Sequence, residues 1–266
     1  YTLWHTLSLH DALPICRVYG KLAAPNKRPL FSMARLDRIK NLTGLAELYG
    51  KSKELQEHCN LILVAGKLRV EESNDYEEAE EIKKLYGIID QYELHGKIRW
   101  LGVRLPKADS GEIYRVIADR HGFFVQPALF EAFGLTILEA MISGLPTFGT
   151  TFGGPLEIIR DKVNGFYINP TNHEETAAKI LEFVTICERE DDKYWYHISN
   201  GGMERVYSTY TWKIHTQRLL TLARVYGFWN YSSKENREDL FRYLEALFYL
   251  IYKPRAQELL EQHSHR

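Results

Sequence analysis

Two glutamates bracket a glycine in the stretch EAFGLTILEAMISGLP, which begins at Glu131. Two carboxylates could act as acid and base in hydrolysis, cap a helix, or hold the two ends of a ligand. If Glu131 to Glu139 formed one helix, eight steps of ~100° would leave the side chains about 80° apart and ~12 Å along the axis. Gly134 argues against one continuous helix, and Thr136 to Glu139 has the form of a capping box. We therefore expect Glu131 in a loop and Glu139 in the first turn of a helix.

The segment between the two glutamates is typical of an anion-binding loop. Phe133, Gly134, Leu135 and Thr136 would offer backbone N–H groups that no helical carbonyl accepts, at the positive end of a helix dipole. A glycine also lets the backbone approach a ligand closely. The spacing does not forbid a hydrolytic pair, but the loop itself favours a phosphate.

Matching cations lie in FSMARLDRIKN, where Arg35 and Lys40 follow an expected strand. Taken alone, the two side chains would be solvated loop charges. Near an anion site in the same sheet, arginine can grip a phosphate bidentately and lysine can act as a point charge. Together they would neutralise a diphosphate without a metal ion.

A third stretch, FGTTFGGPLEII, repeats the order of strand, glycines and helix, with Pro155 at a first helical position. It is either a tight turn or a further ligand loop. The chain has neither an HExxH zinc motif nor the glycine-rich motifs of nicotinamide enzymes and ATPases. We expect no metal site, since the pair His263 and His265 lies in a terminal tail.

Short apolar runs that alternate with helix-period segments must position these residues. Most of the runs are apolar on both faces, which is typical of buried parallel strands. The expected strands are Leu30–Ala34, Leu61–Ala65, Ile98–Leu101, Phe123–Gln126, Pro146–Thr150 and Phe166–Ile168. The expected helices between them lie near Leu42–Tyr49, Tyr76–Tyr86, Gly111–Asp119 and Thr136–Ser143. This order predicts an α/β fold with a doubly wound, six-stranded parallel sheet that binds ligands at the carboxyl ends of its strands.

The chain beyond Pro170 is expected to be helical, first over Glu174–Cys187, Lys193–Tyr207 and Trp212–Tyr226. An apolar stripe at helical spacing follows, formed by Leu240, Phe241, Leu244, Leu247, Phe248 and Ile251. We expect this stripe to pack on the sheet domain or on a partner subunit.

The bulk composition fits a globular protein of one large domain or one domain with an appendage. The 34 basic and 35 acidic residues balance, which gives no sign of nucleic-acid binding. Three widely spaced cysteines fit a reducing cytoplasm. The longest apolar run, Ala246 to Tyr252, is far shorter than the roughly 18 residues that a membrane span needs.

The motifs RLDRIKN, E-x7-E and GGP-x-E resemble the donor-binding half of the family-4 retaining glycosyltransferases, which have the GT-B fold. The wider stretches FVQPALFEAFGLTILEAM and YTWKIHTQRLLTLARVYGFW resemble the sucrose synthase family. The likeness begins near Val18, so we interpret residues 1–16 as a foreign or misread leader. The resemblance implies a Rossmann-like nucleotide-sugar domain over residues 17–211 and a helical extension over residues 212–266.

By this resemblance, Arg35 and Lys40 hold the diphosphate of the donor. Glu131 lies beside the transferred glucose, the backbone of residues 133–135 contacts sugar and phosphate, and Glu139 binds the ribose diol. The pair of glutamates would then bracket a nucleotide sugar rather than hydrolyse a bond.

The implied reaction is reversible glucosyl transfer with retention, in which NDP-glucose and D-fructose give NDP and sucrose. UDP, ADP and their glucose conjugates are the implied nucleotides, and no cofactor or metal is needed for the chemistry. A missing acceptor domain would complete the active site, so the chain alone would be inactive. The family further implies a cytoplasmic homo-oligomer, a tetramer at full length.

The sequence departs from the plant-type pattern at the expected base pocket. Arg104 and Ser110 stand where that pattern has Gln and Asn, within LGVRLPKADSG, which we interpret as a mobile loop. Arginine offers only donors but can stack on a purine, which predicts that ADP is used at least as well as UDP. Alternatively, Arg104 points into solvent. Two other functions remain open: a sucrose-phosphate synthase-like enzyme and a non-catalytic nucleotide-binding module.

Overall fold

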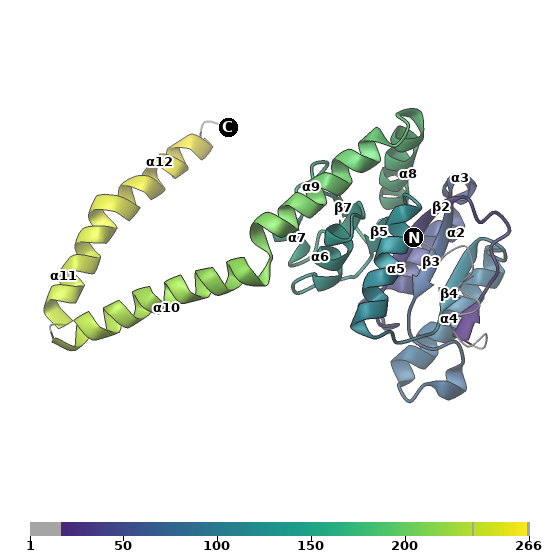
Figure 1. The fold of residues 1–266 in the computed structure, drawn as a ribbon, viewed down its shortest axis with the longest axis horizontal. Helices are drawn as coiled ribbons and strands as arrows, with labels where there is room; N and C mark the ends of the chain where they lie inside the picture. The colour runs from purple at the N-terminus through teal and green to yellow at the C-terminus, as the bar shows by residue number, and fades with distance from the viewer. Residues whose placement is uncertain (1–16, 236, 265–266) are drawn as a thin grey trace. The chain divides into compact units, whose positions relative to one another are not determined.

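The computed structural model describes residues 17–235 and 237–264 of the chain, so the interpreted leader lies outside the described residues. Over the described residues, seven strands form one sheet in the order β1-β4-β3-β2-β5-β6-β7 (Figure 1). The strands are β1 (Val18–Tyr19), β2 (Arg28–Met33), β3 (Cys59–Val64), β4 (Ile98–Leu101), β5 (Phe123–Gln126), β6 (Thr147–Thr150) and β7 (Phe166–Ile168).

All six expected strands are present and pair in parallel, as the runs of apolar residues predict. The order of the strands reverses between β2 and β5, which are neighbours, because the chain builds outward from β2 to β4 and then from β5 to β7. Such a reversal opens a crevice at the carboxyl ends of the two central strands. The expected doubly wound α/β fold is therefore confirmed.

One strand was not expected from the sequence. Val18 and Tyr19 form β1, which pairs antiparallel with Leu101 and Trp100 at the edge of the sheet. Two residues are too few to show the alternation that identifies a strand. The edge strand makes the sheet seven-stranded.

Helices flank the sheet and connect its strands. They are α2 (Leu42–Lys51), α3 (Lys53–His58), η2 (Val70–Glu72), α4 (Tyr76–Gln91), α5 (Lys107–Asp119), α6 (Leu135–Ile142), α7 (Pro155–Ile158), α8 (His173–Arg189) and α9 (Lys193–Thr209). The starts of α5 and α6 differ from those expected. Pro106 stands at the N-cap of α5 and its carbonyl accepts from the Ser110 N–H at 3.0 Å, so part of the expected loop is helical.

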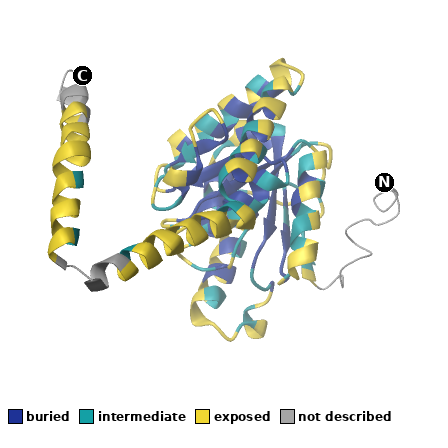
Figure 2. Ribbon diagram, turned by 60° about the vertical axis from the view of Figure 1, so that its left-hand side comes forward, coloured by how far each residue is buried: buried dark blue, intermediate teal, exposed yellow. Residues whose placement is uncertain are grey.

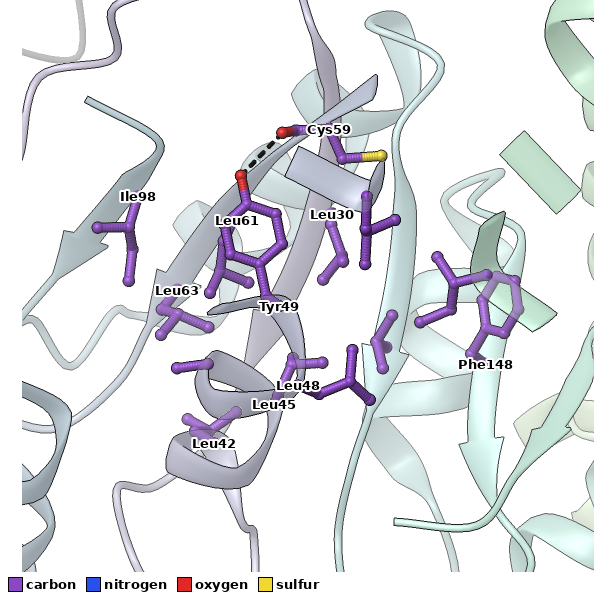
Figure 3. Close-up of a cluster of buried hydrophobic side chains, with 14 of the residues drawn as sticks. Leu30, Leu42, Leu45, Leu48, Tyr49, Cys59, Leu61, Leu63, Ile98 and Phe148 are labelled. Carbon is purple, nitrogen blue, oxygen red and sulfur yellow. Dashed lines mark hydrogen bonds between the residues drawn. The ribbon is translucent and has the colours of Figure 1, made fainter. Parts of the chain in front are cut away.

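Two hydrophobic cores lie on opposite faces of the sheet. On one face, α2, α4 and α8 cover strand residues such as Leu61 and Phe148, which are fully buried. Figure 3 shows side chains of α2 beside those of the strands in this core. On the other face, α5, α6 and part of α9 cover residues such as Phe31 and Phe124. Burial raises the pKa of the Cys59 thiol to about 12, so this cysteine is a packing residue rather than a nucleophile.

The chain from Thr211 onward forms a second compact unit. It consists of α10 (Trp212–Glu235), α11 (Arg237–Leu247), the π-helical turn η3 (Phe248–Tyr252) and α12 (Lys253–Ser264). Most of the described residues of this unit are exposed (Figure 2). Within the expected apolar stripe, Phe241 is 69% exposed and Ile251 is 56% exposed. The packing partner of this stripe stays a prediction.

None of the helices over residues 17–235 and 237–264 combines the length and apolar character that crossing a membrane requires.

Candidate functional site

Lys40 and Glu131 meet at the carboxyl edge of the sheet, where the strand order reverses. Lys40 follows β2 and Glu131 follows β5, and Lys40 Nζ lies 2.8 Å from Glu131 Oε2. The two side chains are only 23% and 14% exposed. Partial removal from water strengthens their attraction, so this pair fixes the two loops more firmly than a surface ion pair would.

The loop after β6 holds the backbone of Glu131. The Glu131 N–H donates to the Phe152 carbonyl at 3.0 Å, and the Gly154 N–H donates to the Glu131 carbonyl at 2.8 Å. Gly153 has a φ of 106°, and a Cβ atom there would lie 2.1 Å from the backbone carbonyl oxygen of Glu131. Only glycine fits this close approach. The GGP turn is therefore a tight turn that clamps Glu131.

Asp37 organises the loop that carries the two expected cations. Its Oδ1 accepts from the Lys40 N–H at 2.8 Å, and its Oδ2 lies 3.1 Å from Arg35 Nη2. The Asp37 side chain is 15% exposed, whereas that of Arg35 is 82% exposed. Sequence reasoning did not single out Asp37, although its position between the two cations in RLDRIKN was a signal.

Two further hydrogen bonds join the loop after β2 to the loop after β5. Asn41 Nδ2 donates to the Pro127 carbonyl at 3.1 Å, and the Leu129 N–H donates to the Ile39 carbonyl at 2.8 Å. Asn41 adopts a left-handed conformation with a φ of 54°, which asparagine tolerates better than most residues. The loops after β2, β5 and β6 thus form one hydrogen-bonded assembly.

Arg35 lines a cavity of about 890 Å³ at the carboxyl ends of β2, β3 and β4. The expected residues Arg104, Ser110 and Thr136 line the same cavity. Arg104 is exposed, and the Ser110 hydroxyl donates to the Pro106 carbonyl at 3.1 Å. The structure thus brings Arg35 together with the expected base-pocket residues, and it brings Lys40 together with Glu131.

The start of α6, in the expected anion loop, differs from the predicted capping box. Gly134 is the N-cap of α6 with a φ of 105°, and no side chain caps the helix. Thr136 is therefore already inside the helix and Glu139 lies beyond its first turn, so the predicted capping role of Glu139 is wrong. Leu135 begins the helix, and the Phe133 side chain is 48% exposed.

Glu139 is half-buried in α6. Burial raises the pKa of its carboxyl group, and the positive charge of Lys107 on α5 only partly opposes this shift. Burial also raises the pKa of the Tyr114 hydroxyl, and the negative charge of Glu139 raises it further. The buried Tyr114 hydroxyl has no hydrogen-bond partner among the described residues.

Residues 20–195 match the sequence profile of the family described as glycosyl transferases group 1. The chain belongs to this family. Among the curated relatives of this group 1 glycosyl transferase is the sucrose synthase of Thermosynechococcus vestitus, which is 74% identical over 250 residues. The alignment covers 94% of this chain but only 31% of that relative, so the chain spans about a third of its length.

Solved structures share the fold of this group 1 glycosyl transferase. Sucrose-phosphate synthase from Thermosynechococcus elongatus matches with a TM-score of 0.61 at 21% identity, covering 76% of this chain and 47% of that one. Anabaena HepE in complex with UDP-glucose matches with a TM-score of 0.59 at 21% identity, covering 75% of this chain and 49% of that one. At this level of identity the two matches establish the fold alone.

Proposed function

We propose that this chain is the nucleotide-sugar-binding part of a sucrose synthase. The complete protein would transfer glucose reversibly and with retention, so that NDP-glucose and D-fructose give NDP and sucrose. The observation that carries this proposal is the Lys40–Glu131 pair at the point where the strand order reverses. The 74% identity to a sucrose synthase favours this activity over that of a sucrose-phosphate synthase.

Arg35 and Lys40 would neutralise the diphosphate as it becomes the leaving group. Stabilisation of developing charge by fixed cations is a large contribution in enzymes of this kind, and here it would operate without a metal ion. Glu131 would contact the transferred glucose, and Glu139 would accept hydrogen bonds from the ribose diol. The backbone of Phe133, Gly134, Leu135 and Thr136 would complete the contacts to phosphate and sugar.

Arg104 and Ser110 would surround the base. The guanidinium of Arg104 lies on the cavity wall and is exposed, so it is available to stack on a purine. Ser110 has a short side chain whose hydroxyl already donates to Pro106. Neither residue offers the paired donor and acceptor that an amide would present to uracil. We therefore expect ADP to be used at least as well as UDP.

The acceptor sugar would bind to a domain that this chain does not contain. The complete enzyme would be a cytoplasmic homo-oligomer, with a tetramer as the expected assembly. Positioning of donor and acceptor between two domains can lower the barrier by several kcal/mol. A chain that holds only one wall of the cleft would bind the donor without turning it over.

Calorimetry and a sucrose-cleavage assay test the proposal together. The chain alone is expected to bind ADP, UDP and their glucose conjugates but not to cleave sucrose. Fusion to the N-terminal two-thirds of the Thermosynechococcus vestitus relative is expected to give nucleotide-dependent cleavage. A chain that binds no nucleotide sugar would refute the proposal, and a fusion that binds but never turns over would support the non-catalytic module. Preference for fructose 6-phosphate over fructose would identify the sucrose-phosphate activity.

A further inference from the structure

A buried glutamine ends the strand that precedes Glu131. Gln126 is the last residue of β5 and is only 3% exposed. The three residues before it are aromatic or aliphatic and fully buried. A polar amide at such a position is unfavourable unless its hydrogen bonds are made.

Within the residues that the structure describes, only one end of the Gln126 amide has a hydrogen-bond partner. Its Nε2 donates to Glu131 Oε2 at 2.7 Å. Its Oε1 is buried and has no hydrogen-bond partner among the described residues. The amide orientation follows from this contact, because the opposite orientation would place the carbonyl oxygen against the carboxylate. The Gln126 amide therefore donates one hydrogen bond to Glu131, while its own carbonyl oxygen stays unpaired among the described residues.

The contact determines which oxygen of Glu131 is occupied. Oε2 accepts from both Gln126 Nε2 and Lys40 Nζ, at 2.7 and 2.8 Å. Oε1 takes part in no hydrogen bond with the part of the chain that the structure describes. Two donors on one oxygen fix the plane of the carboxylate and leave the second oxygen available as an acceptor.

We propose that Gln126 is a positioning residue for the hexose of a bound nucleotide sugar and acts through Glu131. By holding Oε2, it presents Oε1 to a hydroxyl group of the hexose. This inference rests on the proposed donor site. It predicts that Gln126 affects the binding of an NDP-hexose but not the binding of the NDP, which has no hexose.

Gln126→Met tests the proposal, since methionine has a similar length and no polar group. Calorimetry with ADP and ADP-glucose would be run on this chain, beside Ser199→Ala as a control. Ser199 is buried in α9 and donates to the Gly144 carbonyl at 2.6 Å, so its loss removes a buried hydrogen bond from another part of the fold. We expect Gln126→Met to weaken ADP-glucose binding by about tenfold, as for a lost hydrogen bond to a charged group. ADP binding should stay within twofold, and the control should change neither.

Thermal unfolding separates positioning from a structural role. Gln126→Met removes the unpaired carbonyl but also the donor to Glu131, and these opposing effects should leave its melting temperature close to that of the wild type, whereas Ser199→Ala should lower it. Equal losses for both ligands, or no loss for ADP-glucose, would overturn the role of Gln126 alone. A wild-type chain that binds ADP but not ADP-glucose, or binds neither, would overturn the proposed function and this inference with it.

Discussion

The two ends of the candidate donor site differ in how firmly the fold holds them. At the Glu131 end, Lys40, Gln126 and the turn after β6 all hydrogen-bond to one residue, and its side chain is 14% exposed. At the cavity end, Arg35 is 82% exposed and pairs with its near neighbour Asp37, while Arg104 is exposed. In the proposed donor site, the contrast would make the Lys40–Glu131 end preorganised and the Arg35–Arg104 end adjustable.

Loss of Lys40 should produce the largest effect, because it leaves a carboxylate buried without its cation. We expect Lys40→Met to lower the free energy of unfolding by about 2–3 kcal/mol, somewhat less than for a fully buried pair. Urea unfolding would measure this. The double variant Lys40→Met with Glu131→Gln should recover at least half of the loss. If the single variant is as stable as wild type, the Glu131 end is not preorganised by this pair.

Arg35→Ala should separate binding from stability. Since the Arg35 side chain is exposed, unfolding should change little, but NDP binding should weaken by about 1.5–3 kcal/mol, as for a lost charge-assisted contact. Binding of the nucleoside without phosphates should be almost unaffected. The neighbouring exposed Arg38 provides the control, Arg38→Ala. Calorimetry that finds equal losses for nucleotide and nucleoside would remove Arg35 from the phosphate site.

Glu139 should make nucleoside binding depend on pH. Burial raises the pKa of Glu139, so the folded chain protonates it at a higher pH than an unfolded chain does. Its contribution to stability is therefore largest at low pH and is lost as the pH rises through the raised pKa. In the proposed donor site, ligand binding would follow the opposite trend, because the ribose diol would need the ionised acceptor.

Adenosine binding should therefore weaken by about tenfold as the pH falls through that pKa, as for one hydrogen bond to a charged group. Glu139→Gln should bind weakly at every pH and should remove the pH dependence. Calorimetry over a pH series would measure both properties. An unchanged pH profile in Glu139→Gln would assign the titration to another group.

The smallest effect is expected at the base. Arg104→Gln with Ser110→Asn should shift the ratio of ADP to UDP affinity toward UDP by about threefold, since an amide can match the uracil edge. Competition binding with the two nucleotides would measure the ratio. Strong selectivity for UDP in the wild type, unchanged in the double variant, would show that these side chains do not select the base.

The sequence predicted the strands, and the edge of the sheet at which the candidate residues lie, better than it predicted their local contacts. Runs of buried aliphatic and aromatic residues located all six parallel strands, because strands covered on both faces must be apolar throughout. The same pattern placed Arg35, Lys40 and Glu131 at the carboxyl edge. The sequence predicted that these three residues converge there, but not the direct Lys40–Glu131 ion pair, which depends on which two strands are adjacent.

Local geometry explains the errors at the helix starts. The capping-box pattern at Thr136 was misleading because Gly134 adopts a left-handed conformation and starts α6 earlier. Asp37 and Gln126 were missed for a different reason. Each acts through hydrogen bonds to another functional residue, and no periodicity or spacing rule reports such contacts.

The hydrogen bonds that join the three loops restrict how this site can change during evolution or engineering. The bonds from Asn41 to Pro127 and from Leu129 to Ile39 join the loops after β2 and β5, and the bond from Gly154 to Glu131 joins the loops after β5 and β6. A one-residue insertion between these contacts would put the donors out of register. Length variation is therefore excluded from these loops, and only side-chain substitution is open to them. The segment that enters α5 carries no such cross-connection to the three loops among the described residues. Libraries that aim to change the nucleotide should vary both length and sequence there, between Gly102 and Ser110, and should leave the joined loops intact.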